Sequence, residues 1–168
     1  MKKAYHYQSE HFRYDSIQAE DADALVGWRS NPNIVKYYCS PLPVTKESHL
    51  DWFYNIYLKD SSRFDFIVSD GENLVGFVAL MHIDYEAKSA EVNYTIGNPD
   101  YTGCHLSPEM INAVLNFGNR EFNLCNFTAV IHKENIVSQK AVLSAGFQME
   151  SGLGNTIADE QERVVFQK

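Results

Sequence analysis

Residues 91–110, EVNYTIGNPDYTGCHLSPEM, are the stretch of this sequence with the clearest capacity for chemistry. They read as a strand, a loop and the start of a helix, an arrangement that can hold a phosphate on backbone N–H groups and the positive helix end. Such loops are usually rich in glycine, because the backbone must approach the ligand closely. This one has Gly97 and Gly103, but His105 and Ser107 stand where further glycine is expected. We interpret it as a phosphate-binding loop with unusual lining; a plain connecting loop is the alternative.

The strand that precedes this loop has one polar and one apolar face. Side chains alternate along a strand, so the two faces carry Glu91, Asn93 and Thr95, and Val92, Tyr94 and Ile96, respectively. A carboxylate on the polar face can accept a proton from a substrate. The alternative for Glu91 is a solvated strand carboxylate without a catalytic role.

The surrounding elements must position this stretch, and hydrophobic periodicity predicts their order as βαα-βββ-αβ-αβ. The predicted strands cover residues 12–18, 63–69, 73–83, 89–97, 127–132 and 162–168, and the predicted helices cover 20–30, 45–60, 107–122 and 135–147. Thr45 and Ser107 are expected as N-caps, and Gly146 is expected to end the last helix. The fold class is therefore α+β, a largely antiparallel sheet of about six to seven strands with about four helices. The strands before and after the helix at 107–122 are expected to be parallel to each other, as the one exception in this sheet.

Composition bounds the remaining possibilities. With 168 residues and 45% hydrophobic content, the chain is expected to form one domain, residues 1–168. A net charge of −8 with no lysine- and arginine-rich face argues against a nucleic-acid partner. No apolar run approaches the roughly 20 residues that span a bilayer, and the first residues lack the apolar core of a signal peptide. Three cysteines without metal-like spacing and six scattered histidines predict no metal site and a cytoplasmic location.

With these motifs in place, the chain resembles the GNAT superfamily of acetyl-CoA-dependent N-acetyltransferases over nearly its full length. The strand–loop–helix at 91–110 is one basis for the resemblance. The other is HKENIVSQKAVLSAGFQMESG, which is similar to the N-x-x-S…G-F segment of the family, with Asn135, Ser138, Gly146 and Phe147 in register. The resemblance implies a GNAT-like mixed sheet, acetyl-CoA as cosubstrate and no metal.

The loop departs from the family pattern, Q/R-x-x-G-x-G/A. The matching positions run from Thr102 to Ser107, and of the glycines only Gly103, which belongs to a more local G-x-G form, is present. The donors in such a loop are backbone N–H groups, which any residue except proline supplies. The resemblance implies cofactor contacts from Ile96, Gly97, Gly103, Cys104, His105, Leu106, Ser107, Asn135 and Ser138. Asn135 and Ser138 could instead only cap the helix that follows them.

Amide formation from a thioester requires a neutral amine and a protonated leaving thiol. Glu91 is the candidate base, since a free amine is mostly protonated at neutral pH. Family members commonly protonate the thiolate with a tyrosine seven residues after the motif asparagine, but Val142 occupies that position here. Tyr94 is a substitute candidate, and a purely structural core tyrosine is the alternative. Backbone N–H groups near Tyr94 to Ile96 would hold the oxyanion.

Three segments taken together resemble the branch that acetylates nucleotide-linked amino sugars, of the pseudaminic-acid pathway type: WRSNPNI, ESHLDWF and DSSRFDFIVSDGENLVGFVALMHIDYEAKSAEV. The resemblance implies that Arg29 and His49 bind an anionic acceptor. Arg29 could instead neutralise the end of its own helix, and His49 could be an ordinary helix histidine. The expected function is N-acetylation of a nucleotide-linked amino sugar by a monomer or homodimer. The alternatives are a ribosomal-protein-type N-terminal acetyltransferase and a non-catalytic CoA-binding domain.

Overall fold

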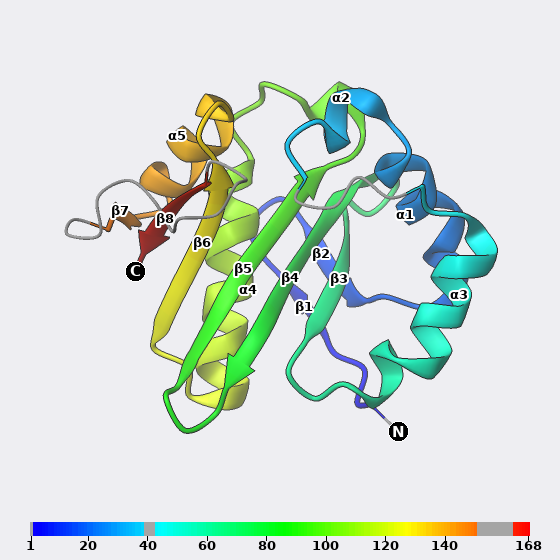
Figure 1. Cartoon of the computed structure of the whole chain (residues 1–168), viewed down its shortest axis with the longest axis horizontal. Helices are drawn as coiled ribbons and strands as arrows, with labels where there is room; N and C mark the ends of the chain where they lie inside the picture. Colours follow the sequence, from blue (N-terminus) through cyan, green and yellow to red (C-terminus); the bar gives the residue numbers. More distant parts are fainter. Residues whose placement is uncertain (1, 39–42, 151–162) are drawn as a thin grey trace.

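The computed structural model describes residues 2–38, 43–150 and 163–168; Cys39 lies outside these ranges. Within them, eight strands form one sheet in the order β1-β2-β3-β4-β5-β6-β8-β7. The strands are β1 (His6–Gln8), β2 (Arg13–Ser16), β3 (Phe64–Ser69), β4 (Leu74–Asp84), β5 (Ser89–Ile96), β6 (Asn126–His132), β7 (Gln148–Met149) and β8 (Arg163–Gln167). The long strands β4 and β5 run through the middle of the sheet (Figure 1).

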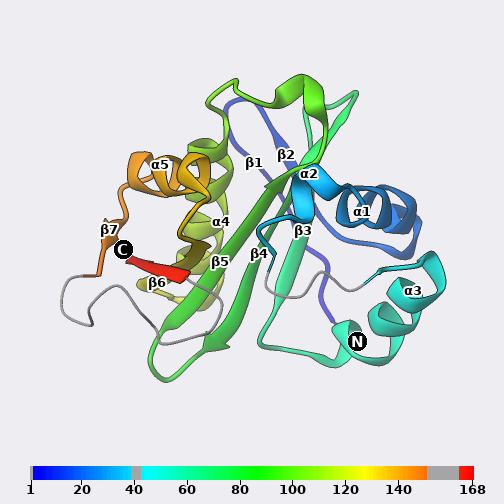
Figure 2. The same cartoon turned by 45° about the horizontal axis from the view of Figure 1, so that its top comes forward.

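Helices cover both faces of this sheet (Figures 1 and 2). They are α1 (Ala22–Arg29), α2 (Pro32–Val35), α3 (Lys46–Asn55), α4 (Ser107–Phe122) and α5 (Ile136–Ser144), with short 3-10 turns η1 (Ala19–Asp21), η2 (Tyr57–Lys59) and η3 (Pro99–Tyr101). The first three helices lie near β3 and β4 on one side, whereas α4 and α5 pack on the other.

Two apolar clusters, one on each face, hold these layers together. The larger one buries Met110, Val114 and Phe117 of α4 against the sheet. The smaller one joins Leu25 of α1 and Phe53 of α3. Neighbouring residues of one strand serve both clusters, because side chains alternate across a sheet. Helical periodicity in residues 107–122 and twofold periodicity in the strands therefore account for the layered arrangement.

The sheet is antiparallel except between β5 and β6, which α4 connects. Their parallel pairing covers only Ser89–Glu91 with Asn126–Thr128. From residue 92 onward, the edge of β5 that faces β6 is not paired with it in the described chain. The two strands thus diverge toward their carboxyl ends, and we call this opening the β5–β6 wedge. It places unpaired backbone groups next to the loop that leads into α4.

The structure confirms the α+β class, the largely antiparallel sheet and the parallel step around the helix at 107–122. The short strands β1 and β7 and the helix α2 were not predicted, since three, two and four residues are too few to show a period. The NPN turn is the start of α2, because Asn31 caps it and Pro32 follows. Thr45 caps α3 as expected: its side chain accepts a hydrogen bond from Ser48 N.

The prediction that Ser107 caps α4 is wrong. The helix begins at Ser107, and Leu106 occupies the N-cap position without a side-chain hydrogen bond. A leucine side chain has no acceptor, so the first amides of α4 receive no cap from it. Gly146, by contrast, follows the end of α5 with a left-handed φ of 92°, as expected for a residue after a helix C-cap.

Candidate active site

The loop between β5 and α4 presents several unused backbone donors at a helix N-terminus. The amides of Gly103, His105, Leu106 and Ser107 donate to no residue that the structure describes. The amides of Glu109 and Met110 bond to the carbonyl of Leu106, at 3.1 and 3.3 Å. Free amides at the positive end of a 16-residue helix form a suitable site for an anion such as a pyrophosphate.

The backbone of this loop has the form that glycine usually takes. Gly103 has a φ of 79° and His105 a φ of 56°, both in the left-handed region. His105 therefore keeps the conformation of the glycine that is expected at this position, at a cost of roughly 1–2 kcal/mol for a residue with a Cβ. Next to it, Cys104 is exposed as a free thiol.

Glu109, the third residue of α4, would oppose an anion if it pointed at the free amides. Its carboxylate instead accepts hydrogen bonds from Ser9 Oγ at 2.5 Å and from the His11 amide at 2.8 Å. The Nδ1 atom of His11 also lies 2.8 Å from Oε2. Partial burial works against ionisation, but these hydrogen bonds hold the pKa of Glu109 below its ordinary value. The Glu109 carboxylate is thus held by hydrogen bonds from the segment that joins β1 to β2.

Tyr94 lies on the apolar face of β5, as predicted, and reaches α5. Its hydroxyl is 2.7 Å from Ser138 Oγ, so the pair links β5 to the helix that follows β6. Burial raises the pKa of Tyr94. Asn135 caps α5, since its side chain accepts a hydrogen bond from Ser138 N at 3.2 Å. Val142 is fully buried in the core, whereas the Tyr94 hydroxyl lies beside the wedge.

Glu91 lies at the closed end of the β5–β6 wedge, opposite Thr128 of β6 and Met81 of β4. Its Oε2 atom is 3.0 Å from Nδ1 of His82, and its side chain is 23% exposed. It shares the polar face of β5 with Asn93 and Thr95, as the alternation predicts. Thr95 is buried, and its hydroxyl is 2.6 Å from the Tyr38 hydroxyl.

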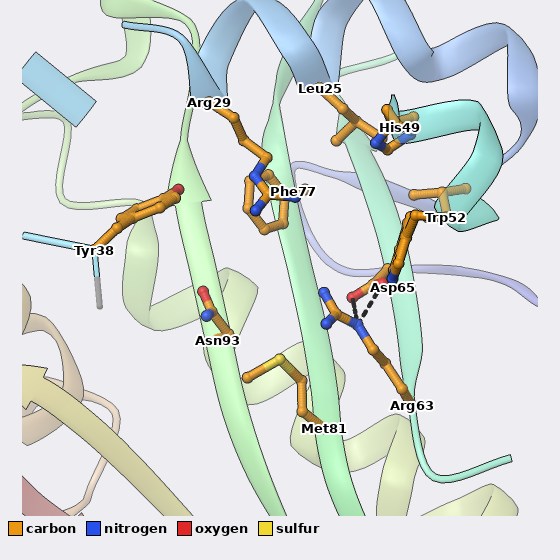
Figure 3. A pocket seen from close by; sticks show the side chains of 11 residues that line it. Leu25, Arg29, Tyr38, His49, Trp52, Arg63, Asp65, Phe77, Met81 and Asn93 are labelled. Carbon is orange, nitrogen blue, oxygen red and sulfur yellow. Dashed lines mark hydrogen bonds and ion pairs between the residues drawn. The ribbon is translucent and has the colours of Figure 1, made fainter. Parts of the chain in front are cut away.

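A pocket of about 160 Å³ lies between this face of the sheet and helices α1 and α3. We call it the helix–sheet pocket; it is lined by Ile17, Leu25, Arg29, Tyr38, His49, Trp52, Arg63, Asp65, Phe77, Met81 and Asn93. Figure 3 shows Arg29 extending over Phe77 toward the interior, with Asn93 and Met81 below it. The structure thus brings Arg29 and His49 together with β5. Glu91 does not line this pocket, but it lies two residues from Asn93 on the same strand face.

The charge in this pocket is mainly positive. Arg63 Nε donates to both carboxylate oxygens of buried Asp65, at 3.1 and 2.8 Å, which neutralises that acid (Figure 3). Arg29 forms no ion pair with a described residue. Asp65 interrupts the apolar strand FDFIVS, which is a local sign of a functional acid. Trp52 and Tyr38 join the pocket through long-range packing, which leaves no local sign in the sequence.

His49 is buried, with 4% of its surface exposed, and neither ring nitrogen has a hydrogen-bond partner among the described residues. Burial, followed by the charge of Arg29, lowers the pKa of its imidazole, so the ring is neutral at pH 7. A buried polar group without a partner is costly, and a ligand in the pocket would supply the missing partner.

Two further predicted cofactor residues have packing roles. A Cβ on Gly97 would lie 2.1 Å from Cδ2 of Trp28, so this position needs glycine for the close approach of α1. Ile96, the last residue of β5, packs against the main core. In the described ranges no group of three or more His, Cys, Asp or Glu side chains is placed to hold a metal. None of the described helices is long and apolar enough to cross a membrane.

Comparison with known proteins agrees with this geometry. Residues 12–148 match the family described as acetyltransferase (GNAT) domain. The chain is 29% identical to the spermidine N(1)-acetyltransferase of Vibrio cholerae, over 82% of this chain and 79% of that protein. It is 27% identical to the N-acetyltransferase p20 of Bacillus licheniformis, over 84% and 82% of the two chains. A crystal structure of the Vibrio cholerae spermidine N-acetyltransferase with CoA and spermine superposes with a TM-score of 0.79 at 23% identity, covering 95% and 94% of the two chains. The chain therefore belongs to the GNAT family of acetyltransferases and is an N-acetyltransferase that uses acetyl-CoA.

Proposed function

We propose that the acceptor of this N-acetyltransferase is an amine that carries an anionic group, with a nucleotide-linked amino sugar as the best-fitting class. The observation that carries the proposal is the position of Arg29 and His49 in the same pocket. They come from two different helices, line one pocket with Asn93 of β5, and have no polar partners among the described residues. An arginine can bind phosphate through two parallel hydrogen bonds, and a neutral histidine can add one donor.

The residues present fit acetyl-CoA, which supplies an activated acetyl thioester when it is bound. The free amides of Gly103, His105, Leu106 and Ser107 would hold its pyrophosphate at the N-terminus of α4. The unpaired edge of β5 between residues 92 and 96 offers backbone groups to the pantetheine arm. Both features border the β5–β6 wedge, so a cofactor held there would place its reactive end beside the polar face of β5.

Two side chains are proposed to move protons. The Glu91 carboxylate would take a proton from the acceptor's ammonium group, which leaves a neutral amine. The Tyr94 hydroxyl, on the opposite face of β5, would donate a proton to the leaving sulfur. Its hydrogen bond to Ser138 holds it between β5 and α5, where the family tyrosine is replaced by Val142. The raised pKa of Tyr94 keeps the hydroxyl protonated at neutral pH.

A polyamine acceptor is the second candidate, because the named relatives include spermidine acetyltransferases. The charges in the helix–sheet pocket argue against it. A polycation would meet Arg29 and Arg63, whereas Asp65, the acid in that lining, is already paired with Arg63. Like charges at short range in a partly buried site repel by several kcal/mol at most and by about 1 kcal/mol where water screens them.

The acceptor class can be tested by measuring CoA thiol release with the purified protein and acetyl-CoA. A UDP-linked amino sugar, spermidine and a basic peptide would be compared at equal concentrations. We expect the sugar nucleotide to give the highest kcat/KM, by about tenfold or more, which corresponds to about 1.4 kcal/mol. Higher turnover of spermidine would overturn the sugar proposal, and higher turnover of the peptide would favour N-terminal acetylation.

A further inference from the structure

The β4–β5 hairpin contains a histidine with an unusual backbone. The register between the two strands shifts between Met81 and Asp84, and His82 lies inside this bulge with a φ of 51°. Glycine takes such a conformation freely, whereas for a residue with a Cβ the same conformation costs roughly 1–2 kcal/mol of folding free energy. Bulges next to active sites often redirect a side chain. The function of this one can be read from what the imidazole contacts.

The His82 ring is directed at the carboxylate of Glu91. Nδ1 lies 3.0 Å from Oε2, and the imidazole is otherwise 76% exposed. An ionised carboxylate can accept hydrogen bonds but cannot donate them, so Nδ1 must carry the proton in this contact. The other carboxylate oxygen, Oε1, has no hydrogen-bond partner among the described residues. One oxygen is therefore held, and the other is available.

We propose that His82 is a positioning residue for Glu91. The Nδ1–H donates to Oε2 and fixes the carboxylate, so that Oε1 accepts the proton of the acceptor's ammonium group. In that step an N–H bond of the ammonium breaks, an O–H bond forms on Glu91, and the nitrogen lone pair becomes free to attack. This inference rests on the proposed role of Glu91 as the base, but it does not depend on which amine is acetylated.

Two substitutions separate the imidazole from its backbone conformation. His82→Gly removes the ring and relieves the left-handed backbone, so the variant should fold with a Tm equal to or above that of the wild type. His82→Asn keeps a side-chain N–H near the position of Nδ1, and asparagine tolerates this conformation. Lys88→Gly is the matched control, because Lys88 has a φ of 53° in the same hairpin.

The test measures kcat and both KM values with any amine that the wild-type protein acetylates. We expect kcat to fall about tenfold in His82→Gly with KM for acetyl-CoA unchanged. His82→Asn should stay within about threefold of the wild type, and Lys88→Gly should match it. In a Glu91→Gln background, which should itself lose roughly 10²-fold in kcat/KM, His82→Gly should have no further effect.

The outcomes distinguish the two claims. Full kcat in His82→Gly, or an equal loss with and without Glu91, overturns the positioning role while the base role stands. Wild-type kcat in Glu91→Gln overturns the base role and the positioning role together. An independent check is the ¹⁵N spectrum of the His82 ring, which should show the Nδ1–H tautomer in the wild type and lose that preference in Glu91→Gln.

Discussion

His105 shows at the level of one residue how a loop can lose a glycine and keep its shape. The backbone retains a left-handed φ of 56°, and the amides of Gly103, His105, Leu106 and Ser107 remain without partners in the described chain. Because the donors belong to the backbone, the side chain at this position is secondary. A histidine there costs folding free energy but leaves these backbone donors in place.

His105→Gly is therefore expected to raise the free energy of unfolding by about 1 kcal/mol, since glycine adopts this conformation without steric cost. Acetyl-CoA affinity should stay equal or become tighter. Denaturant unfolding and calorimetry measure the two effects. Cys104→Gly is the control: Cys104 has no positive φ, so glycine there should lower stability instead. A tenfold loss of affinity in His105→Gly would show that the imidazole itself binds the phosphate.

His49 makes stability depend on pH. Burial and Arg29 lower its folded-state pKa below the ordinary value of 6.5. Between that lowered pKa and 6.5, the unfolded chain binds more protons than the folded chain. The free energy of unfolding therefore falls as the pH drops through this window, and the contribution of neutral His49 is fully present above it. We expect His49→Gln to flatten the difference in unfolding free energy between pH 8 and pH 5. An equal pH dependence in both proteins would mean that His49 does not contribute.

At the level of elements, the loop between β5 and α4 is attached to the rest of the fold at several points. Tyr101 donates a hydrogen bond to the Asp70 carboxylate in the β3–β4 turn, and this bond lowers the pKa of Asp70. The Asn98 side chain donates to the Leu74 carbonyl at 3.0 Å. At the start of the loop, Gly97 lies against Trp28 of α1. The β5–α4 loop and the helix that carries Arg29 are thus in direct contact.

Gly97→Ala should disturb this contact. Its Cβ would lie 2.1 Å from Trp28 Cδ2, so the indole or the loop must shift, at a cost of roughly 1–3 kcal/mol. Gly27→Ala, in the same helix as Trp28, meets no atom within 4 Å and should be neutral or stabilising. Chemical denaturation of both variants measures the difference. Equal stability of the two would contradict the packing role of Gly97.

The elements themselves were largely predictable, because their signals are local. The period of 107–122 and the alternation of 89–97 give α4 and β5 directly, and the caps at Thr45 and Gly146 follow from residue type. Ser107 failed as an N-cap because the helix already begins at residue 107, one residue earlier than a cap at that position requires. The bulge at His82 depends on cross-strand register, which residue types do not reveal.

At the scale of the whole molecule, the two proposed binding sites meet at β5 from different directions. β5 and β6 diverge at the wedge (Figure 1), and the helix–sheet pocket lies over β3, β4 and β5 beneath α1 and α3 (Figure 3). Resemblance selected Arg29 and His49 from sequence, but only the packed fold adds Arg63 and Asp65. The chain's charge of −8 gave no hint of this locally positive pocket. The expected monomer or homodimer stays a prediction.

The most direct test of the proposed acceptor class is the KM of Arg29→Ala for a UDP-linked amino sugar. Loss of a charge-assisted contact of about 1.5–3 kcal/mol should raise this KM roughly tenfold to a hundredfold and leave acetyl-CoA affinity unchanged. Arg13→Ala, an exposed arginine that does not line the pocket, should match the wild type. An unchanged KM in Arg29→Ala, or spermidine turnover that exceeds sugar turnover in the wild type, would contradict an anionic acceptor in this pocket.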